Sequence, residues 1–159
     1  MCLPPRRTDG HRTDGHRADR HRRAVALARD EAAALAAPAL GTEHLLLGLV
    51  REERASPRRV LAGVDPDALR ALLPRPRRAG RRAGPSRRAM AALESARRLA
   101  NRRGEDDAGV EHLLAAVLGD PDCAAVTALE RLGIDVGDLW SRAVAELDRE
   151  RAPRRLALR

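Results

Sequence analysis

The two halves of the sequence repeat each other at a spacing of 68 residues. The register is marked by a Gly-x-Glu-His-Leu-Leu motif that begins at Gly41 and again at Gly109. The same shift superposes further residues: Arg20 on Arg88, Ala28 on Ala96, Ala32 on Ala100 and, on the same helical face, Val25 on Leu93. A repeat of this length indicates two copies of one supersecondary unit. Because each copy is too small to bury a sufficient core, we expect the two to pack as a pseudo-symmetric pair.

Each copy is predicted to form four short helices. Aromatic residues make up only 1% of the chain, so the core must consist of Ala, Leu and Val, and the abundant Ala and Leu favour helix over strand. Thr42 is predicted to cap a helix over residues 43–54. Further helix starts are predicted at Ser56-Pro57, Asp65-Pro66, Ser86, Asp120-Pro121 and Asp135. The predicted fold class is all-α, with about eight helices in two pseudo-symmetric repeats.

Composition divides the chain into five segments. Residues 1–17 contain Thr-Asp-Gly-His-Arg pentads, whose period matches neither helix nor strand, so we predict a disordered His- and Arg-rich tail. The first repeat is placed at 18–73 and the second at 86–148. Between them, the Arg-, Pro- and Gly-rich residues 74–85 are predicted to form an exposed linker. Residues 149–159 are predicted to form a basic C-terminal tail.

The positive charge is concentrated outside the two repeats. The net charge is +8, and all 31 basic residues are arginine. Nineteen of the arginines and 4 of the acids lie in residues 1–23, 74–88 and 149–159. The rest of the chain holds 12 arginines and 19 acids, a net charge of −7. Because a phosphate-binding loop of the Walker type requires a lysine and the sequence has none, an ATPase of that class is excluded.

Cysteine usage and hydropathy favour a cytoplasmic protein. Two cysteines, Cys2 and Cys123, are too few for a disulfide framework, which indicates a reducing compartment. No apolar run approaches the length of a membrane span, so we expect no membrane contact. The arginines near the N-terminus are not followed by the apolar stretch of a secretory signal.

The repeated motif resembles a known family. Gly-Thr-Glu-His-Leu-Leu-Leu-Gly-Leu-Val-Arg-Glu at 41–52 closely resembles the signature of the Clp N-terminal (Clp repeat) domain of the ClpC and ClpA unfoldases, and 109–114 resembles its second copy. The resemblance covers roughly residues 18–148. In the family this domain precedes ATPase modules, whereas the sequence here ends at Arg159. We therefore expect a stand-alone Clp N-domain that recognises partners without unfolding them.

The resemblance implies a non-catalytic protein-binding module of the Clp protease system. Family members dock adaptors and substrates, and ClpC-like members bind phosphorylated arginine. Such a ligand needs a carboxylate for its guanidinium group and helix N-terminal amides or hydroxyls for its phosphate. The ligand-binding residues implied are Glu43, Thr42 and Ala18 in the first repeat and Glu111, Val110 and Ser86 in the second. Ala18 and Val110 lack a hydroxyl, so each predicted site departs once from the family pattern.

We expect a monomer that needs no cofactor or metal and binds Clp ATPase or protease components, adaptors or substrates. The alternative hypothesis is a nucleic-acid-associated protein that acts through its arginine-rich tails. Against it, the chain has no Phe or Tyr and only one Trp for base stacking. An enzyme is the third hypothesis, but the sequence shows no nucleophile–base arrangement.

Several residues also have simpler interpretations. Glu43 and Glu111 could serve only to complement the dipole of a helix start. His44 and His112 are expected to be packed or hydrogen-bonded at helix starts rather than to bind a metal, and His11, His16 and His21 could chelate a metal weakly. Cys123 is expected in the core. Trp140 is expected to close the core of the second repeat, with a surface binding anchor as the alternative.

Overall fold

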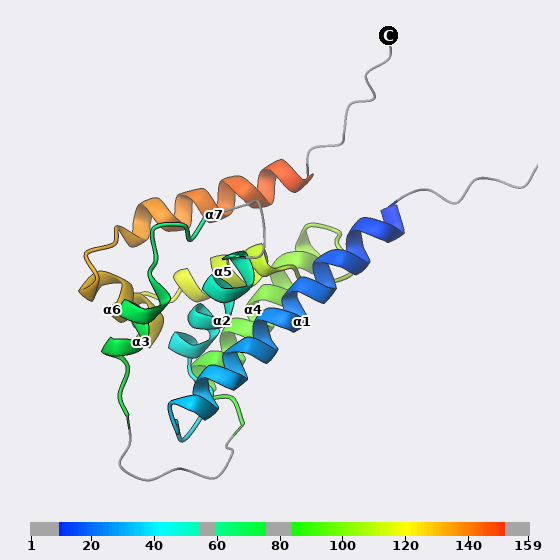
Figure 1. The fold of residues 1–159 in the computed structure, drawn as a ribbon. Helices are drawn as coiled ribbons and strands as arrows, with labels where there is room; N and C mark the ends of the chain where they lie inside the picture. The colour runs from blue at the N-terminus through cyan, green and yellow to red at the C-terminus, as the bar shows by residue number, and fades with distance from the viewer. Residues whose placement is uncertain (1–9, 55–59, 76–83, 152–159) are drawn as a thin grey trace, which may run out of the picture.

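The computed structural model describes residues 10–54, 60–75 and 84–151, and within these ranges the regular elements are helices. They are α1 (Gly10–Ala34), α2 (Thr42–Arg54), α3 (Pro66–Leu72), α4 (Arg87–Arg102), α5 (Val110–Leu118), α6 (Ala124–Arg131) and α7 (Val136–Arg151) (Figure 1). The predicted all-α fold is confirmed. The helix expected to start at Ser56-Pro57 falls on residues 55–59, outside the described residues.

Three of the predicted helix starts are confirmed by their capping hydrogen bonds. In each, the side chain of the predicted cap accepts a bond from a backbone N–H of the first helical turn, as expected for short polar residues. The pairs are Asp65 with Asp67 at 3.0 Å, Ser86 with Ala89 at 3.2 Å, and Asp135 with Asp138 at 3.0 Å.

Two other predicted caps are wrong. Helix α6 begins at Ala124, with Cys123 at the cap, and Asp120 instead closes a turn by accepting the N–H of Asp122 at 3.2 Å. Helix α2 already includes Thr42, which makes Gly41 the capping residue. In both cases the local pattern is compatible with a cap, but the side chain also binds a residue distant in sequence, Arg88 for Asp120 and Ala125 for Thr42.

Helix α1 begins at Gly10, eight residues before the predicted start at Ala18, so the prediction of disorder over 1–17 is wrong for residues 10–17. Glycines at 10 and 15 lower the helix propensity of this segment by about 1 kcal/mol each. A long-range contact offsets this cost: the Arg17 guanidinium lies 2.6 Å from the Glu105 carboxylate of the second repeat. Residues 1–9 lie outside the described part of the chain.

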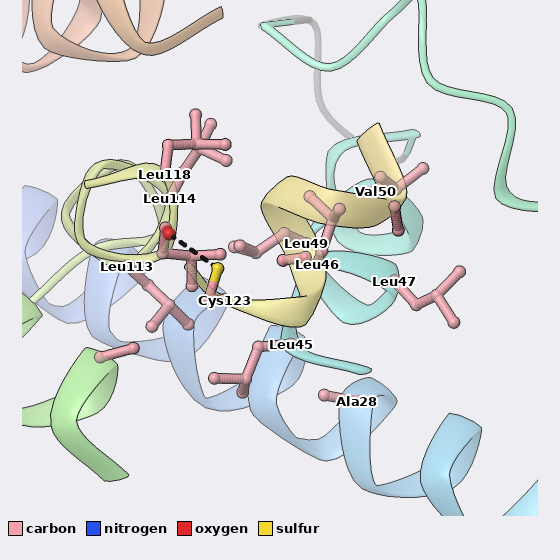
Figure 2. Close-up of a cluster of buried hydrophobic side chains, with 14 of the residues drawn as sticks. Ala28, Leu45, Leu46, Leu47, Leu49, Val50, Leu113, Leu114, Leu118 and Cys123 are labelled. Carbon is pink, nitrogen blue, oxygen red and sulfur yellow. Dashed lines mark hydrogen bonds between the residues drawn. The ribbon is translucent and has the colours of Figure 1, made fainter. Parts of the chain in front are cut away.

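The core lies where the two repeats meet. Helices α2 and α5 are buried along most of their length, and α2 contacts α4, α5 and α6 of the second repeat. Figure 2 shows Ala28 and Leu45 of the first repeat in the same cluster as Leu113 and Cys123 of the second. Cys123 is fully buried, and its thiol lies 3.4 Å from the Val117 carbonyl, so its predicted core position is confirmed.

A short backbone pairing also joins the repeats. Leu40 and Pro85 form an isolated parallel bridge, in which the Ser86 N–H donates to the Leu40 carbonyl at 2.8 Å. This bridge fixes the start of α4 beside the segment that leads into α2.

Trp140 does not close the core. It is 44% exposed, whereas Leu139, Ala143 and Leu147 form the buried face of α7. One residue beyond Leu139 is a rotation of about 100° around the helix, which turns the indole away from that face. Helix α7, like the other described helices, is not long and apolar enough to span a membrane.

The crossing of α1 over α2 depends on Gly48. A Cβ atom at this position would lie 2.2 Å from the Ala24 carbonyl oxygen and 2.7 Å from the Ala28 nitrogen, both backbone atoms. We predict that Gly48→Ala lowers the free energy of unfolding by about 2 kcal/mol, because the helices must separate to admit the methyl group. Chemical denaturation measures this, with Gly63→Ala as the control, since a Cβ there meets nothing within 4 Å. Equal stabilities of the two variants would contradict the close crossing.

Candidate functional site

The two Gly-x-Glu-His motifs start α2 and α5 in the same way. The Gly41 N–H donates to Nδ1 of His44 at 2.9 Å, and the Gly109 N–H donates to Nδ1 of His112 at 3.0 Å. Burial lowers the pKa of both histidines, so they remain neutral and can accept through Nδ1. The expectation of hydrogen-bonded histidines at the helix starts is confirmed.

Thr42 connects the two repeats. Its side chain is buried, and its Oγ1 accepts the N–H of Ala125 in α6 at 3.3 Å. Val110, the counterpart of Thr42 in the second repeat, is buried as well but has no hydroxyl to make such a bond. The local sequence suggested a helix cap at Thr42, and the actual partner is 83 residues away.

The two motif carboxylates differ in their surroundings. The Glu43 side chain is half-buried, folds back over Gly41 and lies 3.4 Å from Nδ1 of its neighbour His44. A Cβ at Gly41 would approach the Glu43 carboxylate to 2.2 Å, so this position requires glycine unless Glu43 moves. Glu111 is only 6% exposed and accepts from Nη1 of Arg20 at 3.2 Å.

Arg20 also binds Glu52, which makes a buried charge cluster between the repeats. Its Nε and Nη2 donate to the two oxygens of Glu52, each at 3.0 Å. The three residues line a cavity of about 20 Å³, together with Val60 and Ala143. That volume has room for about one water molecule. We call this the closed site.

A second, open hollow lies between α4, α5 and the start of α2. Its volume is about 240 Å³, and it is lined by Thr42, Arg88 and Asp120 above small side chains such as Ala92 and Ala116. Nη1 of Arg88 donates to both oxygens of Asp120, at 2.9 and 2.7 Å. We call this the open groove.

The closed site and the open groove are counterparts under the 68-residue repeat. The shift carries four residues that line the closed site onto four that line the open groove: Arg20 onto Arg88, Glu52 onto Asp120, Leu49 onto Val117 and, in the reverse direction, Val110 onto Thr42. Each site therefore joins the first helix of one repeat to the second helix of the other.

The lengths of the flanking helices explain why one site is closed. Helix α7 has 16 residues and lines the closed site with Ala143 and Glu146, whereas its counterpart α3 has 7. Helix α1 begins nine residues before the position that corresponds to the start of α4. The longer α7 therefore contributes to the wall of the closed site, whereas no residue of α3 lines the open groove.

This arrangement changes how the predicted site residues are grouped. The start of α1 faces the second repeat, where Arg20 binds Glu111 and Nδ1 of His21 lies 3.4 Å from the Gly109 carbonyl. The start of α4 faces the first repeat, where Ser86 binds Leu40. The hydroxyl residues Thr42 and Ser86 thus fall on the side of the open groove, and Ala18 and Val110 on the side of the closed site.

Comparison with known sequences identifies the family. A sequence model of the Clp repeat (R) N-terminal domain matches residues 18–80 and 85–155. The chain belongs to this family. Among curated protein sequences, no relative was detected.

The Clp repeat fold is also found in solved structures. The N-terminal domain of the ClpD chaperone from Arabidopsis thaliana is 22% identical, with a TM-score of 0.69, and the match covers 82% of this chain and 93% of that one. The Hsp104 N-terminal domain from Candida albicans is 17% identical, with a TM-score of 0.64 and coverage of 79% and 87%. A structure from a malarial protein secretion system is 15% identical, with a TM-score of 0.58 and coverage of 82% and 94%.

Of the charged residues that form the Arg20 cluster and the Arg88–Asp120 pair, sequence reasoning assigned a binding role only to Glu111. The repeat pairs Arg20 with Arg88, but their carboxylate partners were not identified, although the same shift carries Glu52 onto Asp120. Of the 19 arginines in the clusters behind the nucleic-acid hypothesis, 9 lie at 1–9, 76–83 and 152–159, outside the described residues. In the described part of the Clp repeat domain, no group of three or more His, Cys, Asp or Glu side chains could hold a metal.

The closed site is expected to hold the two repeats together. We predict that Arg20→Ala lowers the free energy of unfolding by about 3 kcal/mol, because Glu52 and Glu111 stay buried without this cation. Urea denaturation measures the change. Arg88→Ala, the counterpart in the open groove, should leave the unfolding midpoint nearly unchanged because its ion pair is exposed. Equal losses in the two variants would contradict the assignment.

Glu53, which also lines the closed site, makes stability depend on pH. Its carboxylate accepts the N–H groups of Val60 and Leu61, both at 2.6 Å, and burial raises its pKa to about 7. Between pH 4.5 and 7 the unfolded chain therefore releases a proton that the folded chain keeps, and stability falls as the pH rises. We predict that, between pH 4.5 and 7, the free energy of unfolding of the wild type falls by on the order of 1–3 kcal/mol relative to that of Glu53→Gln. A pH-independent difference between the two unfolding free energies would contradict the prediction.

Proposed function

We propose that this chain is a non-catalytic protein-binding module of a Clp protease system, which recognises substrates or adaptors and performs no unfolding itself. The observation that carries the proposal is the open groove. Its counterpart is filled by an internal ion cluster, while the groove keeps a volume of about 240 Å³ and presents both charges at its rim.

The ligand class that we propose is phosphoarginine on protein substrates. A phosphoarginine side chain carries an anion and guanidinium N–H donors within one group, so it needs a cationic or hydroxyl partner and a carboxylate partner. Thr42 and the cation Arg88 line the open groove. We propose that Ser86 and the half-buried carboxylate of Glu43, which lie close to these residues in the sequence, complete the binding site.

We propose that only one of the two sites binds this ligand. At the closed site, the Glu111 carboxylate is held by the Arg20 guanidinium, and the hydroxyl positions are occupied by Ala18 and Val110. Arg20 thus occupies the carboxylate that a phosphoarginine guanidinium would use. A single ligand per chain follows.

The proposed partners are the substrates, adaptors and ATPase components of a Clp system in a reducing compartment such as the cytoplasm. A free, buried thiol at Cys123 is compatible with that compartment. A module that binds marked substrates can act by delivering them to an unfoldase or by competing with its own N-domain. We propose that it does so as a monomer.

Isothermal titration calorimetry with a phosphoarginine peptide and its unphosphorylated counterpart tests the proposal. We predict selective binding of the phosphorylated peptide with a stoichiometry near one, and about tenfold weaker binding by Glu43→Gln, since a charge-assisted hydrogen bond is lost. Val110→Thr, which restores the hydroxyl at the closed site, is the matched control and should leave stoichiometry and affinity unchanged. Two ligands per chain, or equal affinity for the two peptides, would contradict the proposal.

A further inference from the structure

The two counterpart arginines differ in how many of their nitrogens are engaged. Arg20 uses Nε, Nη1 and Nη2 to bind Glu52 and Glu111. The bonds that Arg88 makes within the described ranges all run from Nη1 to Asp120. Its Nε and Nη2 have no acceptor among the described residues, and the side chain is 53% exposed. Arg88 can therefore bind an anion through its other edge.

Asp120 is the carboxylate that lines the open groove. It lies on the same rim as Arg88, and its side chain is 37% exposed. Glu43, by contrast, is folded over Gly41, and its carboxylate lies beside His44. The groove thus presents one cation and one anion that are already in contact.

From this contrast we propose that Arg88 and Asp120 exchange partners when the ligand binds and so determine the specificity of the groove. Arg88 takes the phosphoryl oxygens of a phosphoguanidine group, and Asp120 accepts an N–H of its guanidinium. The inference rests on the proposed function and adds two residues, neither of them in the Gly-x-Glu-His motif, that select for a ligand carrying both charges.

The charges explain the selection. An exposed ion pair opens at little cost, because water solvates both partners. A ligand with only a phosphate satisfies Arg88 but leaves its own negative charge beside Asp120, and an unmodified arginine has the reverse conflict with Arg88. A phosphoguanidine group satisfies both sides with charge-assisted hydrogen bonds.

The closed site shows the same chemistry satisfied from within the chain. There the guanidinium of Arg20 lies between the carboxylates of Glu52 and Glu111. Under the 68-residue shift, the bond between Arg20 and Glu111 corresponds to a bond between Arg88 and Glu43. The described structure shows no such bond. The groove therefore retains charged groups whose unused hydrogen-bonding capacity an external ligand can satisfy.

The test uses three peptides of one sequence, carrying phosphoarginine, phosphoserine or arginine, titrated into the full chain. We expect Asp120→Asn to weaken phosphoarginine binding about tenfold and to strengthen phosphoserine binding about threefold, because the repulsion is removed. Arg88→Gln should weaken both phosphorylated peptides. Asp19→Asn is the matched control and should change nothing, because Asp19 is an exposed partner of Arg22 on α1.

Two outcomes would overturn the inference. If Asp120→Asn leaves phosphoarginine affinity unchanged or raises it while Glu43→Gln abolishes binding, Asp120 is not a ligand, although the proposed function stands. If the wild type binds none of the three peptides, the partner exchange and the proposed ligand class both fail. Circular dichroism of each variant confirms that lost affinity does not reflect lost structure.

Discussion

The bond between the Arg20 guanidinium and two carboxylates from different helices organises this molecule. It joins α1 to Glu52 of its own repeat and to Glu111 of the other, and the three side chains are nearly removed from water. Burying ions costs several kcal/mol each, and that cost is offset only where the hydrogen-bonding geometry is good. The cluster therefore ties the relative position of the repeats to a specific set of contacts, in a way that the apolar core of small and branched side chains does not.

Duplication supplied two such positions, and the chain uses them differently. The longer α7 lines one position, where the cavity is about 20 Å³. The other position keeps the arginine and an acid, and it has the smaller Val117 in place of Leu49. In the function that we propose, one copy serves stability while the other binds the ligand. The difference explains how two corresponding positions of a pseudo-symmetric fold can form cavities of different volume.

The sequence predicted the features that depend on local pattern or on the repeat. These include the helical class, the capping residues Asp65, Ser86 and Asp135, and the buried Cys123. It could not predict features that depend on partners distant in the chain. The helical pattern around Thr42 is compatible with a cap, and its bond to Ala125 appears only once α2 and α6 are placed together. Likewise, the polar, low-complexity sequence at residues 10–17 indicated disorder. The contact that Arg17 makes with Glu105 spans 88 residues, so it could not be predicted from the local pattern. Aligning the two repeats identifies which residues correspond, but it does not show which residues contact one another. Because both sites combine residues of the two repeats, their composition could not be predicted in this way.

Nuclear magnetic resonance titration with a phosphoarginine peptide can distinguish the two sites, because four residues of the open groove have counterparts that line the closed site. The account predicts that the backbone amides of Thr42, Arg88, Val117 and Asp120 shift with a common affinity, while those of Val110, Arg20, Leu49 and Glu52 do not. Shifts concentrated on the second set, or of equal size on both, would show that the closed site binds the ligand and would contradict the account.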